Sequence, residues 1–319
     1  MTNITRKEFL QTLAAAGTAA AFSSVGAVDV MAQNAADNVY NLVAVMGGPK
    51  DEPEGLFNLA IAQMGGMKRF IKPGMKVTIK PNIGWDKKPE LSANTNPILV
   101  SAIIKACWDA GAKEITVFDH TCDQWRRCYQ SSGIEEAAKK LGAKVVPGNE
   151  PEYYREIQLP RAKSMKTAMV HQAILDCDAW INCPVMKNHS GARMTLCMKN
   201  HMGIVLDRRY MHTHDIQQCI ADICTLKPAA VLNIVDAYRA MLTNGPRGRS
   251  EADVVNPKAL IMGTDIVAVD TLATKFFGQF INMPLNEVGH LAHGEELGLG
   301  TMNPPKESIK MINLKRRTN

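Results

Sequence analysis

Short β-branched segments alternate with longer segments of helical periodicity along most of the chain. The predicted strands are centred near Leu42, Ile79, Val117, Val145, Ile181 and Ile234. The predicted helices cover residues 54–70, 97–110, 134–141, 166–175, 216–225 and 266–277. Such alternation is typical of a mostly parallel sheet with helices on both faces. The pattern therefore predicts an α/β fold of the Rossmann-like kind.

Capping signals support several of these helix boundaries. Asn96 precedes Pro97, which combines a favoured N-cap residue with proline in the first turn. Gly111 and Gly142 stand where two helices should end. Proline and glycine are otherwise spread along the chain, and no long linker separates two regions. We therefore expect residues 33–319 to form a single domain, in which residues 186–213 are an inserted active-site segment.

The first 32 residues have the features of an export signal peptide. Arg6 and Lys7 precede an apolar run rich in small residues, which ends in a small-residue cleavage sequence at Ala32. Lysine replaces the second arginine of a twin-arginine signal, so the general secretory route stays open beside the twin-arginine route. The run is too short and too rich in alanine and glycine for a transmembrane helix. We expect an exported, periplasmic protein whose mature form has no integral membrane segment.

The charge balance changes the picture only slightly. The chain of 319 residues has a formal net charge of +6, which favours small anionic partners. It contains no block rich in lysine and arginine and no interleaving of basic and aromatic residues. Nucleic acid is therefore not an expected partner.

Polar side chains follow four of the predicted strands. They are Lys80 and Asn82, Asp119 and His120, Lys187 and His189, and Asp236. In open α/β sheets, ligands bind outside the carboxyl ends of the strands. Each of these residues taken alone could equally be a solvated loop residue. Their recurrence at the same end of successive strands predicts a shared cleft.

The segment from residue 183 to residue 214 contains thiol and imidazole groups at close spacing. The candidate metal ligands are Cys183, His189, Cys197, His201, His212 and His214. Thiolate and imidazole suit zinc, iron, nickel or copper, although the spacing is not that of a zinc finger. The expected cofactor is a transition metal or an iron–sulfur cluster of open identity. The alternative, in which the cysteines belong to the core and the histidines cap loops, also stays open.

A third interpretation of the same segment is an anion site. Lys187 and Lys199 offer ammonium groups, and Asn188 and Asn200 offer amide donors, to a carboxylate or a phosphate. Lys80 and Asn82 would join them across the cleft, and Arg208 and Arg209 would extend the positive rim. This interpretation is compatible with a bound metal.

Two further patterns carry weaker expectations. Cys122 and Cys128 follow the Asp119–His120 strand end, and we expect an oxidised loop clasp there in preference to a redox pair. Glu287, His290 and His293 have helical spacing, but the second copy that a di-iron bundle needs is not visible. We therefore expect these three residues to lie on the surface.

The segments "CPVMKNH", "TLCMKNHMG", "IVDAYRAMLTNGPRGR" and "MGTDIVAVD", in that order, resemble the DUF362 family. The resemblance runs from about residue 43 to about residue 300. The positions that fit the family pattern are His189, Thr195, Lys199, Asn200, Gly203, Asp236, Asn244, Asp265 and Asp270. Cys183, Cys197 and His201 are not part of it, so the resemblance places the chemistry on His189, Lys199 and Asn200.

The resemblance also bears on partners. Some relatives carry an appended ferredoxin-like domain, which implies an iron–sulfur or redox association. We see no such segment in this chain, so we expect an electron carrier to be either a separate redox partner protein or a cofactor within the α/β unit. The family is also distantly similar to the nickel-dependent lactate racemases at the level of fold.

Together these expectations describe an exported α/β protein that acts on a small anionic substrate. We expect His189 to be a general base or a metal ligand, Lys199 to hold a substrate oxygen, and Asn200 to orient it. The remaining expected site residues are Lys187 as a catalytic group and Lys80, Asn82, Asp119, His120, Asp236 and Asn244 as substrate-binding groups. The reaction class would be a metal- or iron–sulfur-associated oxidoreductase or an isomerase. The alternative is a non-catalytic periplasmic protein that holds a metal or an anion for a redox partner.

Overall fold

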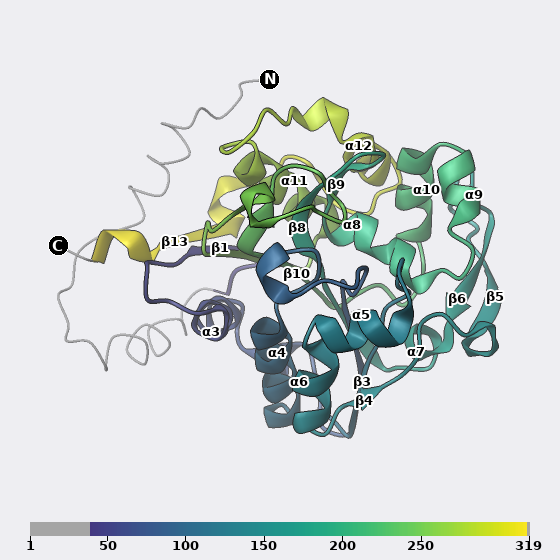
Figure 1. Cartoon of the computed structure of the whole chain (residues 1–319), viewed down its shortest axis with the longest axis horizontal. Coiled ribbons are helices and arrows are strands. Elements are labelled where there is room, and N and C mark those ends of the chain that lie inside the picture. Colours follow the sequence, from purple (N-terminus) through teal and green to yellow (C-terminus); the bar gives the residue numbers. More distant parts are fainter. Residues whose placement is uncertain (1–38, 318–319) are drawn as a thin grey trace.

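The computed structural model describes residues 39–317, and the predicted export signal of residues 1–32 lies outside them. A large mixed sheet crosses the described part of the chain, with helices on both of its faces (Figure 1). Most of its neighbouring strands are parallel. This arrangement confirms the predicted α/β fold.

The main path of the sheet has the strand order β13–β1–β12–β10–β7–β2–β3–β4. The bounds are β13 Ile309–Asn313, β1 Leu42–Met46, β12 Ala259–Gly263, β10 Leu232–Met241, β7 Ala179–Cys183, β2 Lys76–Pro81, β3 Glu114–Val117 and β4 Lys144–Val145. From β10 to β4 every neighbouring pair is parallel, whereas β12 runs antiparallel to both β1 and β10. The carboxyl ends of β10, β7, β2 and β3 therefore meet at one edge.

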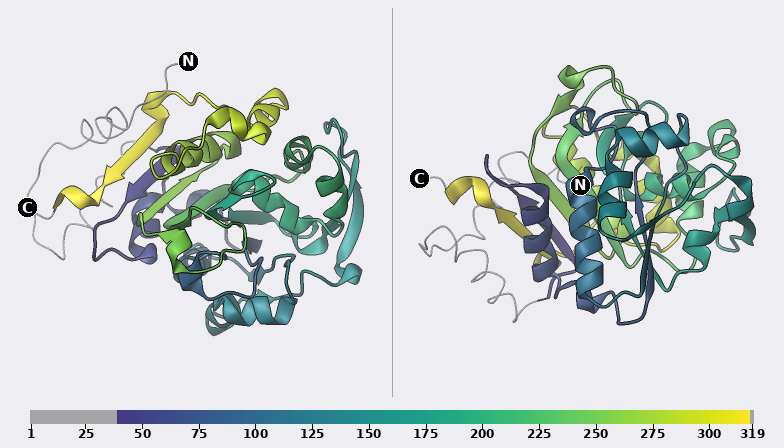
Figure 2. Two further views of the ribbon diagram at one scale, coloured as in Figure 1. Left: turned by 45° about the horizontal axis from the view of Figure 1, so that its top comes forward. Right: turned by 60° about the horizontal axis from the view of Figure 1, so that its bottom comes forward.

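Helices cover both faces because successive side chains in a strand point to opposite sides. In β1, Val43 and Val45 pack in the core cluster that contains α3 (Pro53–Gln63), α4 (Pro97–Asp109) and α6 (Ile134–Lys140). Leu42 and Ala44 pack in the opposite cluster with α10 (Ile216–Ile223), α11 (Ile266–Phe277) and α12 (Gly289–Glu296). Figure 2 shows these two groups of helices on opposite sides of the sheet.

Most predicted elements are confirmed. The six strands are β1, β2, β3, β4, β7 and β10, and five of the helices are α3, α4, α6, α10 and α11. The helix predicted over residues 166–175 is wrong. Strand β6 (Thr167–His171) pairs there with β5 (Tyr154–Gln158), and only the short α7 (Gln172–Leu175) is helical. Inward-facing Ala168 and Val170 show the two-residue period that the helical assignment overlooked.

The chain between β7 and α10 folds over the carboxyl edge of the sheet. It contains β8 (Val185–His189), β9 (Arg193–Thr195), α8 (Cys197–Asn200), the 3₁₀ turn η5 (His201–Ile204) and α9 (Arg209–Thr213). Strand β8 pairs with β10 through an irregular register and with β9 as a hairpin. This stretch corresponds to the predicted inserted segment. Among residues 39–317, no helix is long and apolar enough to span a bilayer.

Candidate functional site

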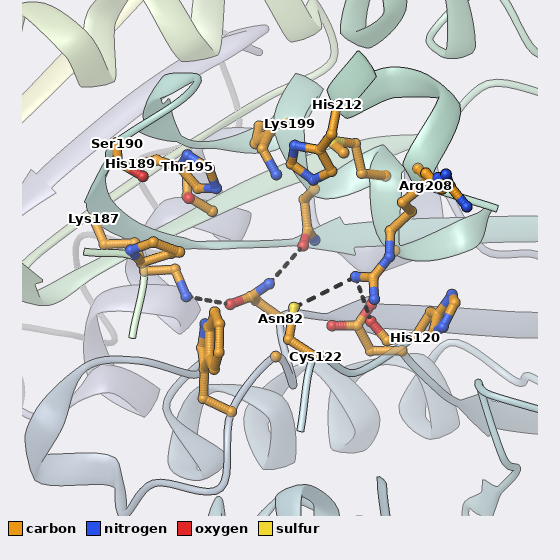
Figure 3. A pocket seen from close by; sticks show the side chains of 18 of the residues that line it. Asn82, His120, Cys122, Lys187, His189, Ser190, Thr195, Lys199, Arg208 and His212 are labelled. Atoms are coloured by element: carbon orange, nitrogen blue, oxygen red, sulfur yellow. Dashed lines mark hydrogen bonds between the residues drawn. The ribbon is translucent and has the colours of Figure 1, made fainter. Parts of the chain in front are cut away.

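A cavity of about 540 Å³ opens between the carboxyl edge of the sheet and the segment that covers it (Figure 3). Loops after β2 and β3 form one wall, and residues 187–212 form most of the other. The polar lining residues are Asn82, Asp119, His120, Cys122, Lys187, His189, Ser190, Thr195, Lys199, Asn200, Asp207, Arg208, Arg209 and His212. Residues from two strand ends and from the inserted segment thus share one cavity.

Beneath the cavity floor lies a buried ion pair. Lys80 Nζ is 2.7 Å from Asp119 Oδ1, and both side chains are almost fully inaccessible. Lys80 Nζ also donates to Asn200 Oδ1 at 2.7 Å, and Asp119 Oδ2 accepts from the backbone N–H of Ile83 at 2.6 Å. Burial lowers the pKa of Lys80, and the adjacent Asp119 carboxylate opposes that shift. Lys80 therefore supports the floor and does not line the cavity.

The ion pair leaves no room for a side chain at position 203, where the chain has glycine. A Cβ atom at Gly203 would lie 2.0 Å from Asp119 Oδ1 and 2.4 Å from Lys80 Nζ. The backbone carbonyl of Gly203 also accepts from the N–H of His120 at 3.1 Å. A residue without a side chain thus lets the turn after α8 approach the end of β3.

A chain of amides links the floor to the core of the sheet. Asn200 Nδ2 donates to Asn182 Oδ1 at 2.8 Å, and Asn182 Nδ2 donates to Asn233 Oδ1 at 3.0 Å. At the cavity surface, Asn82 Nδ2 donates to Asn200 Oδ1 at 3.3 Å and Asn82 Oδ1 accepts from Lys187 Nζ at 2.8 Å. Asn200 is therefore a buried structural centre that fixes the directions of Lys80 and Asn82.

Lys187 and Lys199 bring two lysines with lowered pKa to the cavity. Burial is the main cause for both, and it lowers the pKa of Lys187 to about 7 and that of Lys199 to about 8. Lys187 Nζ donates to Asn82 Oδ1 and to the backbone carbonyl of Ala93. Among the described residues, Lys199 Nζ has neither a hydrogen-bond partner nor a carboxylate partner. Its ammonium group is available to a ligand.

Local structure holds both lysines in place. Lys187 lies in β8 opposite Thr195 of β9. Thr195 is a buried residue of the cavity lining, and its Oγ1 has no hydrogen-bond partner among the described residues. Lys199 lies in α8, whose first N–H groups, those of Cys197 and Met198, donate to the Asp270 carboxylate at 2.8 and 2.7 Å. Asp270 thus caps the short helix that presents Lys199.

His189 lines the cavity in a fixed tautomer. Its Nδ1 accepts from the backbone N–H groups of Gly191 and Ala192, both at 3.1 Å. That nitrogen therefore carries no proton, and the neutral ring holds its proton on Nε2. Burial, with the nearby charges of Lys199 and Lys187, lowers the pKa of His189 to about 2. This geometry makes His189 a hydrogen-bond donor to the cavity and corrects its expected role as a general base.

The opposite side of the cavity contains Arg208 and His120. Arg208 donates to the carbonyls of His120 and Thr121, at 3.1 and 2.8 Å, and to Cys122 Sγ at 3.6 Å. Among the described residues, no carboxylate pairs with its guanidinium. His120 Nδ1 lies 2.8 Å from the carbonyl of Val205, so the proton sits on Nδ1 and Nε2 is an acceptor. Burial lowers the pKa of His120, and Arg208 adds to this effect.

The six expected metal ligands do not form one group. Cys183 and Cys197 are buried in opposite core clusters, and burial holds the pKa of each thiol well above its usual range. His201 is buried edge-on against Trp180, and exposed His214 stacks on Tyr210. Only His189 and His212 of this set line the cavity. Within residues 39–317, no three His, Cys, Asp or Glu side chains are arranged to hold a metal ion.

The protonation of His189 also opposes metal binding. A metal at Nε2 normally leaves the ring proton on Nδ1, where it donates to a nearby acceptor. Here Nδ1 faces two N–H donors. The residues present therefore do not fit the predicted transition metal or iron–sulfur cluster.

Asp236 and Asn244 do not line the cavity, contrary to expectation. Asp236 accepts from the N–H groups of Asn96 and Tyr238, at 2.7 and 3.1 Å, and burial raises its pKa to about 6. Asn244 donates to Asp253 Oδ1 at 2.6 Å within its own loop. Both side chains are occupied in positioning backbone, at the start of α4 and in the loop after β10.

Two cysteine and histidine predictions also need correction. Cys122 and Cys128 are free thiols, because Cys128 is buried in the core while exposed Cys122 lines the cavity. His290 is fully buried, and its Nδ1 lies 2.6 Å from Gln217 Oε1, so it is not a surface residue. The sequence reasoning did not assign Cys122 or Trp85 to the site. Their positions just after the ends of β3 and β2 were the available signal.

Comparisons with known proteins give a sequence relative and a structural neighbour. The chain is 24% identical over 243 residues to "Thylakoid-associated protein sll1697" of Synechocystis, which covers 74% of this chain and 72% of that protein. It is structurally similar, with a TM-score of 0.35 and 13% identity, to the lactate racemase apoprotein from Thermoanaerobacterium thermosaccharolyticum. That match covers 70% of this chain and 54% of the racemase, so the chain spans about half of that structure.

The family described as "Domain of unknown function (DUF362)" matches residues 77–275, which include every strand from β3 to β12 and all of β2 except its first residue. All residues that line the cavity fall within this range. The match covers more than half of the chain, and the chain therefore belongs to the DUF362 family.

Proposed function

We propose that the protein is an enzyme of the isomerase type that binds a small organic anion in the cavity and moves a proton on it. The observation that carries this proposal is the ammonium group of Lys199, which faces the cavity without a partner among the described residues. Its pKa, lowered to about 8, lets Lys199 give up and regain a proton near neutral pH.

Anion binding is supported by the charges around the cavity. Lys187, Lys199 and Arg208 have no carboxylate partner among the described residues, and the carboxylate of Asp119 is already paired with Lys80. Thr195 Oγ1 and the Nε2–H of His189 add uncharged donors. A carboxylate or phosphate group would satisfy these donors and offset the charge that the fold concentrates here.

Proton transfer follows from the same charges. A carboxylate held by ammonium and hydroxyl donors makes a neighbouring C–H more acidic, because the donors stabilise the charge that develops on the oxygens. Lys199, in its neutral form, would accept that proton. His120, with an acceptor at Nε2, is the second group suited to exchange a proton on the far side of the cavity. We propose that this chemistry takes place in the periplasm, because the first 32 residues are predicted to be an export signal.

Deuterium exchange tests the proposal. We would incubate the protein in D₂O with short 2-hydroxy carboxylates, 2-amino carboxylates and phosphorylated carboxylates, and follow loss of the C–H signal by NMR. Exchange should occur with the wild-type protein and fall at least about 100-fold in Lys199→Met. Binding of these anions without exchange would support the non-catalytic alternative, an anion-binding protein that serves a partner. Absence of binding to any of them would reject both readings of the cavity.

A further inference from the structure

We infer that the ligand of the cavity carries two anionic groups on a short carbon chain, one bound beside Lys187 and Thr195 and the other beside Arg208. This inference rests on the proposed function and narrows its substrate class to dicarboxylates and phosphorylated carboxylates.

The lysine end of the cavity consists of Lys187, His189 and Thr195. Strands β8 and β9 hold Lys187 and Thr195 opposite each other, and the turn between these strands holds the ring of His189. Lys187 Nζ uses two of its three N–H groups on Asn82 Oδ1 and Ala93, which leaves one for a ligand. The Thr195 residue is only 3% exposed, and its Oγ1 has no hydrogen-bond partner among the described residues. Thr195 therefore offers a buried hydroxyl donor and not a surface hydroxyl.

The arginine end of the cavity is Arg208 with His120. Three of the five N–H groups of Arg208 are used on two backbone carbonyls and on Cys122 Sγ, none of which is a carboxylate. The remaining two N–H groups, and the whole positive charge, are left for an anion. The bonds to the carbonyls of His120 and Thr121 fix the guanidinium on the loop after β3, so it cannot swing across to the lysine end.

Figure 3 shows the two ends on opposite sides of Asn82 and Cys122. Lys187, His189 and Thr195 lie on one side, and Arg208 and His120 lie on the other. Lys199 lies between them in this view, and the charge of Arg208 contributes to its lowered pKa after burial. Because the two sets of donors lie on different sides of the cavity, we place one anionic group at each, and a cavity of about 540 Å³ accommodates a ligand of several carbons.

The placement of Lys199 links this inference to the proposed reaction. With an anionic group held at each end, the carbon chain of the ligand passes beneath the Lys199 ammonium. The proton that Lys199 exchanges would then lie on a carbon adjacent to one of the two anionic groups. The two charged groups at the ends, Lys187 and Arg208, would hold the substrate without reacting, and His120 would stay free to exchange a proton.

The test compares the affinities of propionate, succinate and phosphoglycolate at constant ionic strength. The protein used is residues 33–319, without the predicted export signal. Binding is measured by calorimetry and by protection of Cys122 from iodoacetamide, because Cys122 is an exposed thiol on the cavity wall. Half-buried Cys177, outside the cavity lining, is the internal reference in the mass spectrum. We expect succinate or phosphoglycolate, the two probes with two anionic groups and called dianions here in that sense, to bind roughly tenfold or more tightly than propionate, because a second anionic group makes a second charge-assisted contact.

Variants of Arg208 test whether this residue binds the second anionic group of the ligand. Arg208→Gln should remove the advantage of the dianion over propionate, and Arg208→Lys should keep part of it. Arg126→Gln, which removes an exposed arginine outside the cavity, is the matched control. A preference for succinate or for phosphoglycolate identifies the second group as carboxylate or phosphate.

Equal affinity for propionate and both dianions would overturn the inference and leave the single-anion function standing. The same conclusion follows if Arg208→Lys, folded by circular dichroism, weakens propionate and dianions by the same factor. No binding and no protection of Cys122 with any of the three probes would reject both the inference and the proposed function.

Discussion

Lys80 Nζ lies 2.7 Å from Asp119 Oδ1, and the two side chains are buried against the backbone of Gly203. This contact joins the ends of β2 and β3 to the turn that follows α8. Residues from three distant parts of the sequence therefore depend on one ion pair. We therefore expect the shape of the cavity above it to depend on that pair.

Lys80→Met should lower the free energy of unfolding by about 3–5 kcal/mol, because it leaves the Asp119 carboxylate buried without its cation. Urea denaturation followed by circular dichroism measures the change. The double variant Lys80→Met, Asp119→Asn should lose less than the sum of the two single variants, since it removes both charges together. If Lys80→Met lowers the free energy of unfolding by less than about 1 kcal/mol, the ion pair does not contribute to stability as a buried pair would.

Gly203→Ala should destabilise the fold by several kcal/mol or displace the ion pair, because the new methyl group would lie within 2.4 Å of both charged side chains. Gly55→Ala is the matched control. Gly55 lies at an exposed position in α3 with nothing within 4 Å of a Cβ, so alanine there should stabilise the helix by up to about 1 kcal/mol. Thermal unfolding of both variants checks the contrast. Similar melting temperatures for both would contradict the predicted overlap.

The strand-end rule placed Asn82, Asp119, His120, Lys187 and His189 on one cavity from sequence alone. It succeeded because parallel strands of regular pattern must align their carboxyl ends. The rule also placed Lys80 at the correct edge of the sheet, but Lys80 still lies within β2, before the chain leaves the strand after Pro81. Its side chain therefore points below the cavity floor, where it meets Asp119 and Asn200.

The direction of the remaining side chains depends on features that spacing does not encode. The pairing of β8 with β10 shifts register between Asp236 and Met241, and this irregularity decides which residues of β8 face the cavity. Cys183 and Lys187 lie four positions apart in the sequence, yet Cys183 packs in the core and Lys187 faces the cavity. The metal site predicted from cysteine and histidine spacing failed for this reason.

His189 should stay neutral with its proton on Nε2 from about pH 4 to pH 9. The two N–H groups that donate to Nδ1 oppose protonation there, and burial adds to this effect. The ring ¹⁵N chemical shifts of the folded protein would show the tautomer directly. His214, which is exposed, is the matched residue for comparison. Titration of His189 near pH 6.5, or a proton on Nδ1, would contradict the prediction.

Lys187 should make the stability of the protein rise with pH. Its pKa is about 7 in the folded chain against 10.5 in the unfolded chain, so the unfolded chain binds more protons between these values. The cost of burying the ammonium is fully present below pH 7 and is relieved as the pH rises towards 10.5. Lys187→Met should therefore flatten the increase in unfolding free energy between pH 7 and pH 9, which is about 1.4 kcal/mol per pH unit at most.

Urea denaturation at several pH values measures this slope. Lys113→Met, which removes an exposed lysine directly before the first residue of β3, is the matched control. Parallel pH profiles for the wild-type protein and Lys187→Met would contradict the assigned pKa. If Lys113→Met also changes the slope of unfolding free energy against pH, the slope arises from surface charge in general and not from Lys187.

Lys199 should make anion affinity fall as the pH rises above about 8. The ammonium form binds the anion more tightly than the neutral form, which is the form that accepts the proton in the proposed reaction. The pKa of about 8 in the free protein means that Lys199 is half deprotonated at that pH. The association constant for succinate should decrease by up to about tenfold per pH unit above that value, because each binding event must then supply a proton to Lys199.

Lys199→Arg keeps its charge at every pH in this range, so its affinity should decline less steeply. Any slope that remains in Lys199→Arg reports Lys187, whose pKa is about 7. Calorimetric titrations from pH 7 to pH 9.5 measure both profiles, and an affinity of the wild-type protein that stays constant over this range would remove Lys199 from the binding site.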